Sequence, residues 1–148
     1  MRIALASDHA GFALKDELGA WLRDGGHIVI DLGTNGPESV DYPEFGARLA
    51  NAIASGEAER GIAVCGSGIG ISIAVNRNPQ CRCARVDDPL SARLARGHND
   101  ANVLALGGGL IGSDMARVCV TEFLGTDFAG GRHQRRVDQL SQLLQESD

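Results

Sequence analysis

The sequence predicts an α/β fold, with a doubly wound parallel sheet of five strands, helices on both faces and a further helix at the C-terminal end. Two observations favour this class. Short apolar runs alternate along the chain with segments whose apolar residues have helical spacing. The chain has 148 residues, of which 43% are hydrophobic and 22% charged, as expected for one folded domain over residues 1–148. Strands and helices that alternate in this way pair as a parallel sheet with covered faces.

Each element has its own signal in the sequence. Five segments have the apolar composition of strands: residues 2–7, 27–32, 61–64, 82–86 and 102–106. Six segments have helical spacing: residues 12–23, 44–55, 71–76, 89–96, 111–124 and 132–145. Gly25 and Gly26 end the first helix, while Pro43 and Pro89 suit the first turns of the second and fourth. The polar segment 34–42 is a predicted loop.

The strand order determines where a ligand can bind. Right-handed crossovers leave few orders, and we expect the Rossmann-like, flavodoxin-type order 2-1-3-4-5. In this order the connections from strand to strand change direction across the sheet between strands 1 and 3, which is the switch point of the fold. Ligands bind at the switch point, outside the carboxyl ends of the strands. The loops that follow these two strands contain Asp8-His9 and residues 65–70. The fold therefore predicts one ligand site between them.

A cysteine followed by three glycines is the clearest functional signal. Cys65 ends the third strand, and Gly66, Gly68 and Gly70 follow at alternate positions before a helix. Glycines allow tight turns and close approach to a ligand, and the N–H groups at a helix start bind anions and favour a thiolate. With the Ser67 hydroxyl in the same loop, these groups suit proton abstraction next to a carbonyl. The alternative is a buried cysteine beside a structural turn.

The same stretch excludes three other classes of protein. Its G-x-G-x-G pattern follows the third strand, whereas the dinucleotide fingerprint G-x-G-x-x-G follows the first. The sequence contains no P-loop motif. Cysteine phosphatases have an arginine six residues after the cysteine, where this chain has Ile71.

Three further candidates lie near the predicted site. Asp8 offers a carboxylate to a hydroxyl group, and His9 offers an imidazole to an anion. The alternative for Asp8 is a helix cap. Tyr42, the chain's only tyrosine, precedes a predicted helix and either lines the pocket or anchors its own loop.

His98 and Asn99 follow the fourth predicted helix and precede the fifth strand. This position places them toward the opposite edge of the sheet from Cys65. If they serve the same site, we expect them to do so across a subunit interface. The alternative is helix termination, which favours these residue types.

Arg132 and Arg136 are four residues apart and share one face of the last helix. The two arginines repel each other, and a helix N-terminus disfavours cations, so an anion between them would be stabilising. Two guanidinium groups together with free backbone N–H groups suit a phosphate. A solvated charged face and nucleic-acid contacts are the alternatives. A formal net charge of −5 disfavours nucleic acid and anionic membranes as partners, so we expect a small phosphate.

The cysteines and the apolar runs indicate the cellular environment. The sequence contains no C-x-x-C pair, so we do not expect a zinc site. We expect Cys81, Cys83 and Cys119 to pack in the core. No apolar run reaches the roughly 18 residues of a membrane span. The first residues lack a signal-peptide pattern. We therefore expect a cytoplasmic protein with reduced thiols.

Six ordered segments carry a resemblance to a known family: Ser7-Asp8-His9-Ala10-Gly11, Asp41-Tyr42-Pro43, residues 65–72, Ser91-Ala92-Arg93, residues 98–104 and Gly131-Arg132-His133-Gln134. They resemble motifs of the ribose-5-phosphate isomerase B family, which includes the related galactose-6-phosphate isomerase subunits. The resemblance implies a single isomerase domain over residues 1–148 that uses no metal or cofactor. It also implies a homodimer, or a dimer of dimers, with active sites shared between subunits. The implied reaction interconverts D-ribose 5-phosphate and D-ribulose 5-phosphate through a cis-enediolate.

The resemblance implies catalytic roles for four side chains. Cys65 is the base that moves a proton between C1 and C2. Ser67, with the backbone of residues 66–70, stabilises the enediolate oxygen. His98 opens the sugar ring, and Asp8 assists at a ring hydroxyl.

The resemblance also implies how the substrate is held. His9, Arg132 and Arg136 bind the phosphate, and Asn99 orients the sugar. The two arginines and His98 come from the partner subunit. Tyr42 and the glycine loop line the pocket.

Two positions define where this chain lies within the family. One branch uses a glutamate later in the loop, where this chain has Ser72, so Cys65 indicates the cysteine branch. Family members usually have an arginine shortly after the fifth strand, where this chain has Gly109. This difference leaves open the isomerisation of another aldose phosphate (tetrose, allose or galactose phosphate). Sugar-phosphate binding without catalysis also stays open.

Overall fold

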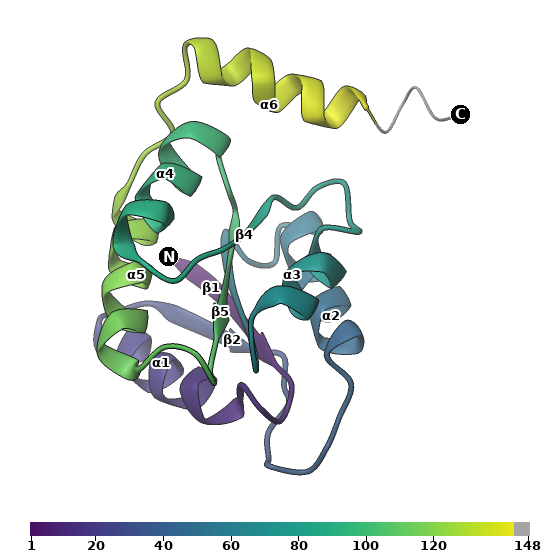
Figure 1. Cartoon of the computed structure of the whole chain (residues 1–148), viewed down its shortest axis with the longest axis vertical. Helices are drawn as coiled ribbons and strands as arrows, with labels where there is room; N and C mark the ends of the chain where they lie inside the picture. The colour runs from purple at the N-terminus through teal and green to yellow at the C-terminus, as the bar shows by residue number, and fades with distance from the viewer. Residues whose placement is uncertain (144–148) are drawn as a thin grey trace.

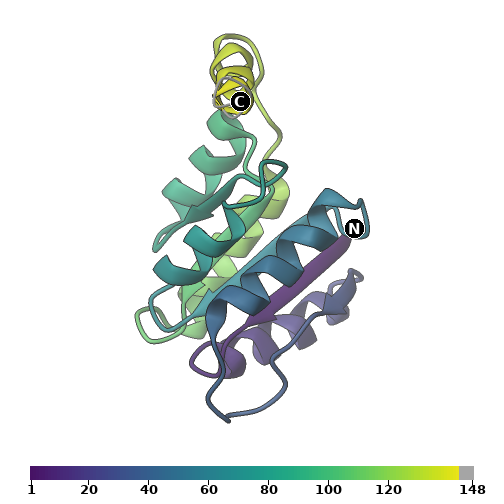
Figure 2. The ribbon, with the colours of Figure 1, turned by 90° about the vertical axis from the view of Figure 1, so that its right-hand side faces the viewer.

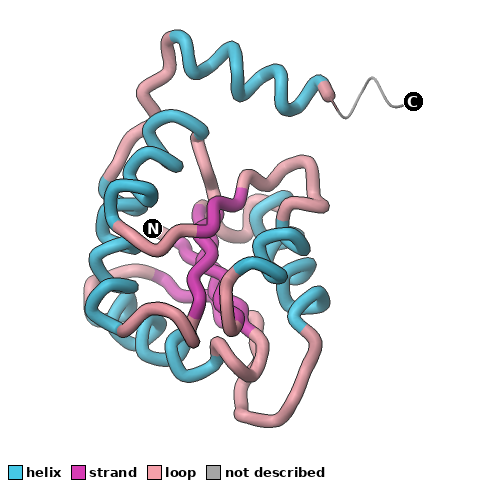
Figure 3. The backbone as a smooth tube through the Cα atoms, in the orientation of Figure 1, coloured by secondary structure: helices cyan, strands magenta, loops and turns pink. Residues whose placement is uncertain are grey.

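Five parallel strands form the central layer of the computed structural model, which describes residues 1–143 (Figure 1). In chain order the elements are β1 (Arg2–Ser7), α1 (Phe12–Asp24), β2 (Ile28–Asp31), α2 (Tyr42–Ala54), β3 (Arg60–Cys65), α3 (Ile69–Val75), β4 (Cys83–Arg85), α4 (Pro89–Asn99), β5 (Val103–Gly107), α5 (Ser113–Gly125) and α6 (Arg132–Gln142). Helices lie on both sides of the strands (Figure 3). The predicted α/β class with its C-terminal helix is confirmed, and residues 144–145 of that predicted helix lie outside the described residues.

The two faces of the sheet carry different side chains because successive strand residues point in opposite directions. Helices α1, α4 and α5 cover the face with the larger residues, which include Ile3, Leu5, Ile62, Val64 and Leu104. Helices α2 and α3 cover the face with mostly small residues, which include Ala4, Ala6, Ala63, Cys65 and Ala105. Figure 1 shows these two groups of helices on opposite sides of the strands. Cys65 therefore lies on the α2/α3 face.

The predicted strand order 2-1-3-4-5 is wrong at its last two positions, because the observed order is β2-β1-β3-β5-β4. All five residues of β5 are buried, so this strand needs a neighbour on each side and cover on both faces. By contrast, β4 has only three residues, each partly exposed, and Arg82 directly precedes it. Short strands with charged neighbours are typical of sheet edges. The switch point between β1 and β3 is unchanged.

Helix α4 extends three residues beyond its predicted end, to Asn99. Gly97 does not end the helix, because Asp100 bonds back to Arg96 through both its backbone N–H and its side chain. The Asp100 N–H donates to the Arg96 carbonyl over 3.2 Å, and Arg96 Nη1 lies 2.8 Å from Asp100 Oδ1. Asp100 ends the helix in a left-handed conformation, with φ of 48°. His98 and Asn99 therefore belong to the last turn of the helix.

An ion pair between a buried lysine and a partly exposed aspartate fixes a loop at the carboxyl end of the sheet. The Lys15 ammonium is fully buried and lies 2.6 Å from Asp31 Oδ1, which also accepts the Gly33 N–H over 2.9 Å. The Gly33 carbonyl accepts the Ser7 N–H, and the Ser7 carbonyl accepts the Thr34 N–H, each over 2.8 Å. This chain of bonds connects the ion pair to the residue before Asp8.

Replacing Asp31 with Ala should lower the free energy of unfolding by about 3 kcal/mol, because the Lys15 ammonium would remain buried without its carboxylate. Urea unfolding at fixed protein concentration measures the change. Asp24→Ala is the matched control, since Asp24 is exposed at the end of α1, the helix that carries Lys15. This control should lower the free energy of unfolding by less than about 0.5 kcal/mol. Equal losses in the two variants would contradict this role for the ion pair.

Candidate functional site

The Cys65 thiol lies at the end of β3, where the chain turns sharply into α3. The Gly68 N–H donates to Cys65 Sγ over 3.2 Å, and Cys65 is only 4% exposed. Gly68 has φ of 76°, a left-handed conformation that glycine adopts without strain. The loop thus folds back so that a backbone donor faces the sulfur. Such a donor stabilises a thiolate.

Close backbone packing explains two of the glycines in and beneath this loop. A Cβ on Gly68 would lie 2.8 Å from the Leu106 carbonyl carbon, and a Cβ on Gly107 would lie 2.8 Å from the Ser67 carbonyl group. The loop therefore lies directly on the end of β5. Glycines at these positions allow a backbone-to-backbone contact that side chains would prevent.

The loop after β1 meets the loop of residues 65–70, called the thiol loop below, as the sequence predicts. The Asp8 N–H donates to the Val64 carbonyl over 3.3 Å, and a Cβ on Gly66 would lie 3.6 Å from the Ala10 Cβ. The Asp8 side chain is mostly buried, and its Oδ1 accepts the Gly11 N–H over 3.0 Å. One carboxylate oxygen therefore closes the turn before α1. Asp8 is not the helix cap that was its alternative role, because Gly11 is the N-cap of α1 and no side chain caps that helix. The second carboxylate oxygen can accept another hydrogen bond.

His9 and Tyr42 extend the same site. The His9 Nδ1 accepts the Val40 N–H over 3.1 Å. Nδ1 also lies 3.2 Å from the Val40 carbonyl oxygen, to which the other tautomer would donate. In the tautomer that accepts the Val40 N–H, the proton is on Nε2, which can then donate to an anion. Tyr42 begins α2, and its ring lies over Gly70, where a Cβ would be only 2.6 Å from the ring. Tyr42 thus contacts the thiol loop directly and remains 40% exposed.

Sequence reasoning missed Arg85, which reaches the thiol loop from the end of β4. Its Nε donates to the Ser67 carbonyl over 2.9 Å, and its Nη1 lies 2.6 Å from Asp87 Oδ2. The same rule that identified Asp8 could have identified it, because Arg85 also stands at the carboxyl end of a strand. The Lys15–Asp31 pair gave no local signal, since its partners are 16 residues apart.

The other predicted site residues form a second cluster on α4 and α6. The His98 and His133 rings stack with centroids 4.1 Å apart and planes 11° apart. Loss of solvent around the His133 ring, together with repulsion from His98, Arg132 and Arg136, lowers the pKa of His133. Asn99 and Arg136 line a hollow of about 560 Å³ beneath α6. This concentration of positive and neutral donors suits an anion.

The two clusters lie at opposite ends of the sheet. Cys65 pairs with Gly107 at the end of β5, whereas His98 precedes the start of that strand at Val103. Four strand steps span roughly 13 Å. Figure 1 shows α4 and α6 together at the end of the molecule away from the loops that follow β1 and β3. One chain therefore brings Cys65 to Asp8, but does not bring His98, Asn99, Arg132 or Arg136 to them.

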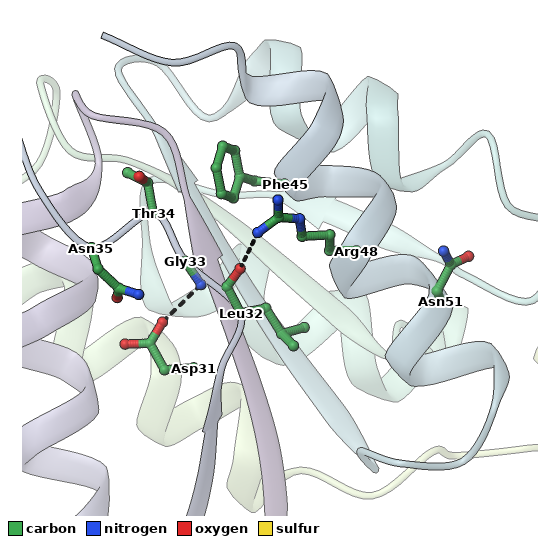
Figure 4. Close-up of a pocket in the computed structure, with 8 residues that line it drawn as sticks. All are labelled: Asp31, Leu32, Gly33, Thr34, Asn35, Phe45, Arg48 and Asn51. Atoms are coloured by element: carbon green, nitrogen blue, oxygen red, sulfur yellow. Dashed lines mark hydrogen bonds between the residues drawn. The ribbon is translucent and has the colours of Figure 1, made fainter. Parts of the chain in front are cut away.

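A separate hollow of about 640 Å³ lies beside the end of β2, against α2 (Figure 4). It is lined by Asp31, Leu32, Gly33, Thr34, Asn35, Phe45, Arg48 and Asn51. Arg48 Nη1 donates to the Leu32 carbonyl over 3.3 Å, and its guanidinium stacks 4.7 Å above the Phe45 ring. The hollow does not include Cys65.

The described part of the chain also lacks the features of two other classes of protein. Residues 1–143 contain no group of three or more His, Cys, Asp or Glu side chains placed to hold a metal ion. Within the same residues, no helix is long and apolar enough to cross a membrane.

Comparison with known proteins gives consistent matches. A family model described as Ribose/Galactose Isomerase matches residues 3–140. Ribose-5-phosphate isomerase B of Escherichia coli strain K12 is 44% identical over 144 residues, which are 97% of each chain. The structure of Clostridium thermocellum ribose-5-phosphate isomerase B superposes with a TM-score of 0.98 at 47% identity and covers 100% of both chains. That of Mycoplasma genitalium ribose-5-phosphate isomerase B with bound ribulose-5-phosphate has a TM-score of 0.93 at 35% identity, and the match covers 98% of this chain and 97% of that one.

The remaining cysteines differ from Cys65 in their surroundings. Burial raises the pKa of Cys81 to about 11 and that of Cys119 to about 11, and it also raises the pKa of Cys83. A thiol reacts as its thiolate, so these three are poor nucleophiles near neutral pH.

Iodoacetamide at pH 8 should modify Cys65 before the other cysteines. At this pH the thiolate fraction of a thiol with pKa near 11 is about one thousandth, so Cys81 and Cys119 should react slowly, whereas Cys65 Sγ accepts a backbone N–H. Mass spectrometry of the digested protein locates and times each modification. Faster modification of Cys81 or Cys119 would place the reactive thiol elsewhere.

Proposed function

The chain belongs to the ribose/galactose isomerase family, and from this premise we propose that it interconverts D-ribose 5-phosphate and D-ribulose 5-phosphate. The observation that carries the proposal is the Cys65 thiol, held by a backbone N–H at the sheet's switch point. Asp8, His9, Ser67 and Tyr42 surround the same point. A base next to hydroxyl and imidazole donors suits an aldose–ketose isomerisation.

Cys65 acts as the base on the open-chain sugar. The thiolate removes the C2 proton of the aldose, the electron pair forms the C1–C2 double bond, and the C1 carbonyl oxygen becomes an enediolate oxygen. The Cys65 thiol then returns the proton to C1, while the O2 proton passes to O1, which gives the ketose. No atom or electron is gained or lost.

Ser67 stabilises the enediolate oxygen. Its Oγ accepts the Ile69 N–H over 3.2 Å, which leaves the hydroxyl hydrogen to donate to the substrate. A donor at the oxygen where negative charge develops lowers the barrier, because it binds the transition state more strongly than the substrate. The backbone of Gly66 and Gly70 allows the sugar to approach closely.

The ring-opening and phosphate-binding residues come from a second copy of the chain, in a homodimer with shared sites. His98 opens the furanose ring with help from Asp8, Asn99 orients the sugar, and the phosphate lies between His9 and the partner's Arg132 and Arg136. The separation of the two clusters within one chain supports this arrangement.

The exposed surface also supports a dimer. Helix α6 extends beyond the layered body of the molecule in both views (Figures 1 and 2). Leu140 on this helix is 48% exposed, and Leu143, directly after its end, is 62% exposed. On α3, directly after the thiol loop, Ile69 and Ile73 are each 51% exposed. Apolar side chains so close to a candidate site are typical of an interface.

A second candidate function is isomerisation of a tetrose or hexose phosphate. Gly109 favours it, because this position has no side chain where family members usually have an arginine. The Gly109 N–H donates to the Gly66 carbonyl over 2.9 Å, and a Cβ would lie 3.1 Å from that oxygen. The ratio of kcat/KM among four-, five- and six-carbon aldose phosphates distinguishes the two candidates.

Cys65→Ala should lower kcat for ribose 5-phosphate by about a thousandfold and leave phosphate affinity nearly unchanged, because only the base is lost. Exchange of the substrate's C2 proton with deuterated solvent, followed by NMR, should stop as well. Cys83→Ala is the matched control and should keep wild-type turnover. Undiminished turnover in Cys65→Ala would exclude Cys65 as the base. Binding without C2 exchange in the wild-type protein would indicate a non-catalytic sugar-phosphate-binding protein.

Mixing Cys65→Ala with His98→Asn should restore activity that neither variant has alone. If each site takes one residue from each chain, a mixed dimer contains one intact site, and random exchange of equal amounts recovers about a quarter of wild-type activity. Cys65→Ala mixed with the double variant is the control, since no intact site can form. Subunit exchange without recovery would contradict shared sites.

A further inference from the structure

A single peptide group connects the Arg85 side chain to the Cys65 thiol. The carbonyl of Ser67 accepts the Arg85 Nε–H over 2.9 Å, and the N–H of Gly68 donates to Cys65 Sγ over 3.2 Å. These two groups are opposite ends of the same peptide bond. In a planar trans peptide the C=O and N–H point in opposite directions, so the guanidinium, the peptide and the sulfur form one continuous chain of hydrogen bonds.

We propose that Arg85 is a positioning residue for Cys65, which orients and polarises the Ser67–Gly68 peptide so that its N–H stabilises the thiolate. A cationic donor on a carbonyl oxygen draws electron density from the amide and strengthens the N–H as a donor, because hydrogen bonds in a chain polarise one another. The effect of Arg85 on turnover rests on the proposed function. Its effect on the thiol rests on this geometry alone.

The surroundings hold the peptide in this orientation. The Ser67 carbonyl lies on Gly107, where a Cβ would be 2.8 Å from it, and Gly68 is left-handed, with φ of 76°. Rotation of the peptide would therefore break the Arg85 bond and the bond to Sγ together. Because the loop contains glycines, which lose the most freedom on ordering, a side chain that fixes one peptide has a clear function here.

The charge on Arg85 is only partly neutralised. Asp87 Oδ2 lies 2.6 Å from Nη1, and the Asp87 side chain is 47% exposed. The Arg85 side chain is 25% exposed, so solvent screens it moderately. Both facts limit the expected effect on the thiol to a severalfold change.

Arg85 also gives this chain a cation beside the thiol loop, although Gly109 has no side chain. Gly109 donates to Gly66, and Arg85 donates to Ser67, so the two positions contact neighbouring peptides of one loop. Arg85 approaches from β4, the edge strand, on the α2/α3 side of the sheet with Cys65. A cation here acts on the loop backbone.

The test measures the pH dependence of Cys65 alkylation by iodoacetamide in Arg85→Gln and Arg85→Lys. Gln keeps an N–H donor without the charge, and Lys keeps the charge. In Arg85→Gln the rate near pH 7 should fall about threefold and the half-maximal pH should rise by about half a unit, with the same rate at high pH. Arg85→Lys should recover at least half of the lost rate. Arg2→Gln is the matched control and should match the wild type, because Arg2 also donates to backbone carbonyls but lies at the other end of the sheet.

Two results would overturn the inference. One is an unchanged alkylation profile in Arg85→Gln. The other is an equal loss of rate at every pH, which would mean that Arg85 controls access to the thiol and not its ionisation. Thermal unfolding of each variant identifies any that does not fold, and Arg85→Lys, the more conservative change, then decides the question.

Turnover provides an independent test of the role of Arg85. In Arg85→Gln, kcat near pH 7 should fall about threefold with KM unchanged, and it should approach the wild-type value at higher pH. If Cys65→Ala retained turnover, the proposed base would be wrong, yet the alkylation profile would still decide the role of Arg85.

Discussion

The site depends on the register of three neighbouring strands. Ser7 pairs with Val64, and Cys65 pairs with Gly107, so β1, β3 and β5 end at the same level. Each strand contributes a loop at that level, and the loop after β3 lies between the other two. A shift of β3 by one residue would place Cys65 on the opposite face of the sheet. Burial of all three strands prevents such a shift, because it would expose the apolar residues of one face and crowd the small residues of the other.

Two cations at this end of the sheet shape loops through backbone groups, and each is paired with a carboxylate. Lys15 is fully buried but pairs with Asp31, and the pair acts on Ser7 through the backbone of Gly33. Arg85 acts on Ser67 in the same way. In both cases a side chain on one element fixes a backbone group on another. A carboxylate 2.6 Å away limits the cost of burying the Lys15 ammonium, and Asp87 lies at the same distance from the partly exposed Arg85 guanidinium.

Local features were predictable from the sequence, and long-range ones were not. The glycine loop, Asp8-His9 and the parallel sheet follow from periodicity and from strand ends, which depend on neighbouring residues. The exchange of β4 and β5 was missed because crossover rules alone do not distinguish an edge strand from a central one. The short length of β4 and its neighbouring Arg82 contained that information. Gly97 suggested a helix end, but the bond between Arg96 and Asp100, which depends on folded geometry, overrides it. The roles of the site residues stay predictions.

Topology explains why, under the proposed function, the site takes residues from two chains. In a right-handed crossover the helix returns antiparallel to the strands, so the last turn of α4 must lie at the amino ends of the strands. A histidine in that turn cannot reach a thiol at the carboxyl end of its own sheet. Helix α6 stays beside α4, because His133 stacks on His98, and it carries Arg132 and Arg136 with it. Under the proposed function the ring-opening and phosphate groups therefore move as one unit. Under the same proposal a second copy brings that unit to Cys65. Catalysis would then require dimerisation, because neither half of the site contains both the base and the two arginines that bind the phosphate.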